Sequence, residues 1–137
     1  MLQKYEEIEL PDPLLIEDSE YESAMTRWEF IEYKYGYRVR GEFILLSGDH
    51  IGRKLIKHWS SVEQDDYGYI IASPYTHLYQ DYTHLFGLPR TGKIDMDNFI
   101  GLPVVISTRC VTRNVNHRII GKDTRYSVVN RVIDLVA

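Results

Sequence analysis

The chain has 137 residues, of which 44% are hydrophobic, and its formal net charge is −4. This length suits one domain that can bury a core without metal ions or cross-links, and a single cysteine, Cys110, excludes an internal disulfide. No apolar run approaches the roughly 20 residues that span a bilayer, and the acidic N-terminus is atypical of a signal peptide. We therefore expect a globular cytoplasmic protein with no membrane segment.

The charge is unevenly distributed. Residues 1–22 contain eight acidic residues and one lysine, whereas the remaining chain contains twelve acidic and fifteen basic residues. We interpret residues 1–20 as an acidic N-terminal arm and residues 21–137 as the folded domain. Pro11 and Pro13 prevent regular structure in the arm. The arm is either a solvated terminus or a docking segment for a protein partner.

Three strands joined by tight turns are predicted at the start of the domain. Residues 22–35 favour a strand, although their Glu and Met content also allows a helix. A turn at 35–37 leads to a second strand over 37–46. A second turn leads to a third strand over 52–62, and all three runs are rich in aromatic and β-branched residues.

Alternation assigns the faces of the second and third strands. In the second strand, one face is expected to carry Tyr37, Val39, Gly41, Phe43 and Leu45, with Arg38, Arg40 and Glu42 opposite. In the third, Arg53, Leu55, Lys57 and Trp59 alternate with Lys54, Ile56, His58 and Ser60. A glycine in mid-strand, at position 41, predicts a bulge or a close backbone approach.

The clearest helix is predicted after a turn at residues 65–68. Ser73 suits the N-cap and Pro74 the first helical position, while Gly87 and Pro89 mark the end. The expected apolar stripe consists of Tyr75, Leu78, Tyr79, Tyr82, Leu85 and Phe86. Its polar residues His77, Gln80, Asp81 and His84 lie off that stripe.

Two more strands are expected, at about 102–113 and 125–136, with a long loop over 114–124. Three strands, a helix and two strands are the order of an OB-fold. The sequence thus predicts a mainly β protein: a five-stranded OB-like Greek-key barrel with one helix between strands 3 and 4.

The basic residues coincide with the elements through which OB-folds bind, namely strands two and three and two loops. Single-stranded nucleic acid needs aromatic rings that stack on bases and cations that follow the phosphates. We therefore expect the binding residues to be Tyr35, Tyr37, Arg38, Arg40, Arg53, Lys54, Lys57, Trp59, Arg113, His117, Arg118 and Lys122, with Tyr33 as a further stacking ring. The alternatives are that the aromatic rings are core residues and the arginines a solvated face.

Catalysis is not predicted. The sequence lacks a P-loop, an HExxH motif and a G-x-S-x-G motif. His77 and His84 are two helical turns, or roughly 10 Å, apart, which excludes one shared ion. Asp65, Asp66, Asp95 and Asp97 could in principle hold Mg²⁺, but they lie in connections, where such residues usually form turns and caps. We expect no cofactor and no metal site.

Several short motifs carry a family resemblance. Residues 43–55, FILLSGDHIGRKL, resemble the hairpin of phage-type single-stranded-DNA-binding OB proteins. With Leu85-Phe86-Gly87, the strand 108–113 and the strand 126–129, the chain is also similar to small proteins carried by phages and integrative elements of proteobacteria. The resemblance covers most of residues 22–135. It implies an OB-like fold and a role in phage or mobile-element DNA replication or recombination.

One departure from that family concerns partner recruitment. Single-stranded-DNA-binding proteins often carry an acidic tail at the C-terminus for partner proteins. Here the acidic arm is N-terminal, so the resemblance does not extend to such a tail.

Two functions follow as hypotheses. The first is a non-enzymatic, sequence-tolerant binder of single-stranded DNA, with RNA as the alternative ligand and homo-oligomerisation left open. The second is a protein-interaction module, such as a phage inhibitor of a host factor or a structural adaptor, that uses residues 1–20.

Overall fold

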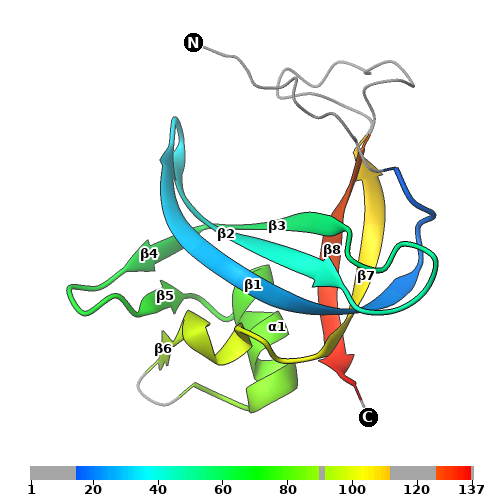
Figure 1. Cartoon of the computed structure of the whole chain (residues 1–137). Coiled ribbons are helices and arrows are strands. Elements are labelled where there is room, and N and C mark those ends of the chain that lie inside the picture. Colours follow the sequence, from blue (N-terminus) through cyan, green and yellow to red (C-terminus); the bar gives the residue numbers. More distant parts are fainter. Residues whose placement is uncertain (1–14, 90–91, 112–125, 137) are drawn as a thin grey trace.

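A computed structural model describes residues 15–89, 92–111 and 126–136 (Figure 1). The chain is mainly β, with a five-stranded antiparallel sheet, a three-stranded sheet and one α-helix in the described ranges. The elements are β1 (Glu20–Tyr33), β2 (Gly36–Leu45), β3 (Lys54–Ser60), β4 (Val62–Gln64), β5 (Ile70–Ala72), α1 (His77–Phe86), β6 (Lys93–Ile94), a 3₁₀ helix (Met96–Phe99), β7 (Val104–Val111) and β8 (Tyr126–Leu135). None of the helices within these ranges is long and apolar enough to cross a membrane.

The large sheet has the strand order β3-β2-β1-β7-β8. The long strand β1 belongs to two ladders, because Glu20–Ser23 pair with β7 and residues 23–33 pair with β2, so that Ser23 takes part in both. A register shift between Met25 and Arg27 falls near this change of partner. The β1–β2 hairpin then extends beyond the body of the protein (Figure 1).

The two edge strands of this sheet, β3 and β8, are in contact without a described backbone ladder between them. A side chain bridges them instead: the buried Lys57 Nζ donates a hydrogen bond to the carbonyl oxygen of Asn130 at 2.5 Å. Lys57 thus reaches across the gap between the first and last strands of the sheet.

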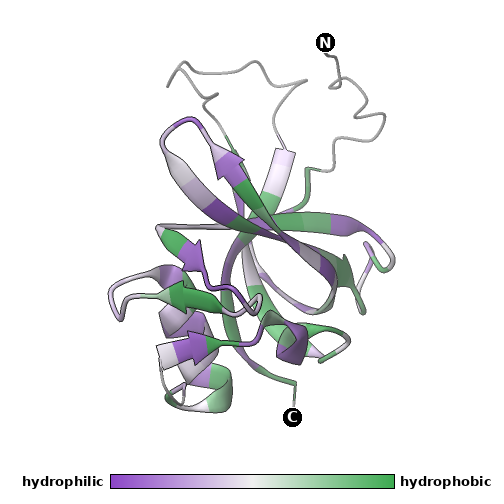
Figure 2. Ribbon diagram, turned by 90° about the vertical axis from the view of Figure 1, so that its left-hand side faces the viewer, coloured by the Kyte–Doolittle hydropathy of each residue, from purple (hydrophilic) through white to green (hydrophobic). Residues whose placement is uncertain are grey.

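One face of β2 and one face of β3 lie in the core. Val39, Phe43 and Leu45 are buried from β2, and Leu55 is buried from β3. Green and purple alternate along the strands in Figure 2, as expected for strands with one buried face. The sequence prediction of three opening strands is therefore confirmed, with ends shifted by about two residues.

Gly41 is a site of close packing. A Cβ at this position would lie 2.9 Å from Met25 Sδ and 3.1 Å from Trp59 Cζ3. The backbone at Gly41 is thus closely approached, by side chains and not by another backbone, and the register shift lies in β1 and not at Gly41.

The helix begins later than predicted. Thr76, not Ser73, is the N-cap: its Oγ1 accepts a hydrogen bond from the backbone N–H of Tyr79 at 3.3 Å. Tyr75 therefore precedes the helix, and it is 91% exposed instead of contributing to the apolar stripe. Leu78 and Tyr82 are buried as expected.

The three short strands β4, β5 and β6 lie where the sequence predicts only turns and connections. A turn between β4 and β5 is held by Asp65, whose Oδ1 accepts hydrogen bonds from the backbone N–H groups of Tyr67 and Tyr69. Lys93 of β6 forms an ion pair with Asp65 at 2.9 Å. The predicted turn role of Asp65 is confirmed, but the small sheet was missed because its strands have only two or three residues each.

Candidate nucleic-acid interface

The side of β1, β2 and β3 that faces away from the core is called here the outer face. Its members, from the strand registers and exposure, are Arg27, Glu29, Ile31, Tyr33, Arg38, Arg40, Glu42, Ile44, Lys54, Ile56, His58 and Ser60. Charged residues therefore alternate with the buried residues of the same strands, and both signs of charge are present.

Arg38 lies at the hairpin end of the outer face. Its guanidinium carbon is 4.4 Å from the ring centroid of Tyr33, which is cation–π distance. The residues directly opposite Arg38 are Ile31 on β1 and Ser60 on β3, neither of which is acidic. Among residues 15–89, 92–111 and 126–136, no carboxylate forms an ion pair with Arg38.

His58 completes this group. Its Nδ1 is 3.5 Å from the hydroxyl oxygen of Tyr33, and the two rings meet edge to face with centroids 6.0 Å apart. Desolvation by the surrounding side chains, followed by the positive charges of Arg38 and Arg40, lowers the pKa of His58 to about 4. The imidazole is therefore neutral near pH 7, and the neighbouring arginines are smaller causes of the shift than desolvation.

Exposed aromatic rings follow at the hairpin tip. Tyr35 is 91% exposed, and Lys34 Nζ lies 5.3 Å from its ring centroid. Tyr37 is also exposed, but it stacks on Phe30 with centroids 5.1 Å apart, on the opposite side of the hairpin from Tyr33. The hairpin thus offers aromatic surface on both of its sides.

Farther from the tip, acidic residues neutralise the outer face. Arg40 Nη1 lies 2.9 Å from Glu29 Oε1. Arg27 approaches Glu42 at 3.8 Å and Glu29 at 4.0 Å. Any anion that approaches Arg40 would therefore have to compete with its carboxylate partner, which is not the case at Arg38 among the described residues.

Two of the predicted binding residues point into the protein. Trp59 is fully buried, where its ring packs against Phe43 and Phe99, and Lys57 is only 6% exposed. The expectation that Trp59 provides an accessible stacking ring and Lys57 a surface cation is wrong. Both lie on the same face of β3 as Leu55, and this face is buried in the core.

The other predicted residues lie in different places. Lys54 is exposed at the far end of β3, opposite Ile44, and Arg53 precedes that strand and is half-exposed. The outer face therefore gathers Arg38, Arg40 and Lys54 from the predicted set. The predicted residues Arg113, His117, Arg118 and Lys122 lie outside the described residues.

A buried carboxylate was missed by sequence reasoning. Asp81 of α1 is buried, and its Oδ2 accepts a hydrogen bond from Trp59 Nε1 at 2.9 Å. Its Oδ1 accepts hydrogen bonds from Arg131 Nε at 2.9 Å and Arg131 Nη2 at 2.6 Å. The only signal in the sequence was its place at i+3 from Leu78, beside the apolar stripe.

The described residues do not assemble a metal site, since no group of three His, Cys, Asp or Glu side chains lies at ligand distance. Asp95 instead caps the 3₁₀ helix, and Asp97 accepts a hydrogen bond from Trp28 Nε1 at 2.8 Å. Comparison of the chain with protein-family models, curated proteins and solved structures finds no match.

Proposed function

We propose that this protein binds single-stranded nucleic acid, DNA in the first place, without sequence preference and without catalysis. The strand order, the helix between β3 and β7, and the contact between β3 and β8 support an OB-like, partly open barrel. The resemblance to phage and mobile-element proteins implies the same arrangement, and with it a role in DNA replication or recombination.

The observation that carries the proposal is the group formed by Arg38, Tyr33 and Tyr35. A guanidinium that stacks on a tyrosine and has no carboxylate partner in the described ranges keeps its donors free for a phosphate. Tyr35 offers an exposed ring within three residues of that cation. Cations beside stacking rings are what sequence-tolerant binding of single strands requires.

Binding is tested by fluorescence anisotropy with labelled oligo-dT at low and moderate salt. We expect binding that weakens as salt increases, because each neutralised phosphate releases counterions. The fluorescence of Trp59 is a poor reporter, since its indole is buried. The proposal is wrong if oligo-dT does not bind at low salt. The alternative function, a protein-interaction module, would then be tested by capture of a partner with and without residues 1–20.

A further inference from the structure

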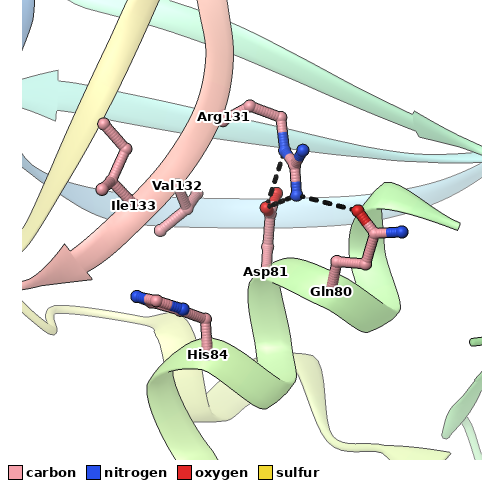
Figure 3. A pocket seen from close by; sticks show the side chains of 6 residues that line it. All are labelled: Gln80, Asp81, His84, Arg131, Val132 and Ile133. Atoms are coloured by element: carbon pink, nitrogen blue, oxygen red, sulfur yellow. Dashed lines mark hydrogen bonds and ion pairs between the residues drawn. The ribbon is translucent and has the colours of Figure 1, made fainter.

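A pocket of about 280 Å³ lies between α1 and β8, away from the outer face of β1, β2 and β3 (Figure 3). It is lined by Gln80, Asp81, His84, Arg131, Val132 and Ile133. A water molecule occupies roughly 30 Å³ in the liquid, so the pocket has room for a phosphate-sized group with several waters.

Arg131 is held in a fixed position at this pocket. Both oxygens of Asp81 are occupied, one by Arg131 and the other by Trp59. Arg131 Nη2 also reaches Gln80 Oε1 at 3.4 Å, as Figure 3 shows. None of the hydrogen bonds among the described residues uses Nη1 of Arg131, so that nitrogen retains both of its donors.

The charge around the pocket is positive. Among the described residues that line it, Asp81 is the one carboxylate and Arg131 the one cation, and the ammonium of Lys57 lies close by, bonded to the carbonyl oxygen of Asn130 next to Arg131. After desolvation, the charges of Arg131 and Lys57 are the main causes that lower the pKa of the neighbouring His77. One carboxylate beside two cations, Arg131 and Lys57, leaves an excess positive charge.

We propose that this pocket binds a small oxyanion, in particular a phosphate group. Arg131 Nη1 and an N–H of His84 are the donors that its lining residues offer, and Asp81 is a positioning residue that orients the guanidinium. The aliphatic side chains of Val132 and Ile133 form the remaining wall. This site is separate from the proposed nucleic-acid interface and does not depend on it.

The first test follows the histidine ring resonances by NMR while inorganic phosphate replaces chloride at constant ionic strength. We expect a saturable shift at His84 and none at His50, which lies beside Tyr21 in the β2–β3 connection. Equal shifts at both histidines, or no saturation, would show that phosphate acts only as bulk salt and would overturn the proposal.

Calorimetry with inorganic phosphate then compares two variants with the same charge change. His84→Glu places a carboxylate in the pocket, whereas Thr83→Glu places it on the adjacent residue, which does not line the pocket. We expect His84→Glu to weaken phosphate binding at least about tenfold and Thr83→Glu to leave it within about twofold. Equal weakening by both variants would contradict the assignment. Arg131→Gln is less suitable because it would leave Asp81 buried without its cation.

Oligo-dT with and without a 5′-phosphate separates two sources of the phosphate group. A shift at His84 with the phosphorylated oligomer alone assigns the pocket to phosphate monoesters, and a shift with both oligomers assigns it to backbone phosphates. Either result supports the anion site. If neither oligomer moves His84 while inorganic phosphate does, the ligand is a free small phosphate compound.

Discussion

The guanidinium of Arg38 lies over the ring of Tyr33, 4.4 Å from its centroid, on the outer face of the sheet. This distance is typical of a cation–π contact, which holds the cation beside an aromatic ring. Arg38 and Arg40 differ in their acidic partners: of the two, only Arg40 forms an ion pair among the described residues, with Glu29.

Reversing the charge of Arg38 should weaken nucleic-acid binding. We expect Arg38→Glu to lower the affinity for oligo-dT about tenfold or more, because it removes a phosphate ligand and adds a repelling charge. The neutral variant Arg38→Gln should reduce the slope of log affinity against log salt by about 0.7. The measurement is anisotropy over a salt series.

Arg109→Glu is the matched control for Arg38, because Arg109 is an exposed arginine on β7, outside the outer face. Its affinity should remain near that of the wild type. If both charge reversals lower affinity equally, binding depends on net charge alone and the outer face is not the site.

Truncating the tip ring should remove a stacking contact. Tyr35→Ala is expected to cost about 1–3 kcal/mol of binding free energy, the range for one base stacked on an aromatic ring. Tyr75→Ala is the control, because Tyr75 is also 91% exposed but lies just before α1 and not at the hairpin tip. Competition titrations with oligo-dT measure both variants, and an unchanged affinity for Tyr35→Ala would remove the hairpin tip from the interface.

The pKa of His58 predicts how stability depends on pH. Its pKa is about 4 in the folded protein and 6.5 in its ordinary state, so the unfolded chain binds the proton more readily. The free energy of unfolding should therefore increase as pH rises from about 4 to 6.5. It decreases again on acidification, because the unfolded chain takes up a proton at His58 before the folded protein does. Urea unfolding over this range should show a smaller pH dependence for His58→Gln than for the wild type; identical pH profiles would contradict the assignment.

The same imidazole reports on binding. A phosphate beside Arg38 and Arg40 would offset their positive charges, so oligo-dT should raise the pKa of His58. An NMR titration of the free and bound protein measures this. A pKa that stays at about 4 in the saturated complex would indicate that the bound strand lies elsewhere.

Removing the charge of Asp81 should destabilise the fold. Asp81→Asn leaves Arg131 without its counter-charge and weakens the acceptor of Trp59, at an expected cost of about 3 kcal/mol. Asp66→Asn, an exposed change in the β4–β5 turn, should cost less than about 0.5 kcal/mol. Urea denaturation measures both, and comparable stabilities would show that the buried carboxylate is dispensable.

Several local features could be predicted because they depend on neighbours in sequence. Alternation of Val39, Phe43 and Leu45 with charged residues assigned the buried face of β2, since successive side chains of a strand point to opposite sides. Gly41 indicated a close approach to its backbone, which side chains make. The same alternation placed Lys57 and Trp59 with the buried Leu55, but the binding hypothesis gave weight to their chemistry instead of their position.

The pairing of distant residues was decided only by the tertiary structure. Asp81 meets Trp59 and Arg131, and Lys57 meets Asn130, because α1 and β8 pack against the same end of β3. No pattern in the sequence links these positions, since hydrophobic periodicity reports which face of an element is buried and not what covers it. The sequence by itself determined the five strands of the large sheet, the helix and the buried face of β2, whereas packing of the sheet decided which charges are buried and which, like Arg38, remain available to a ligand.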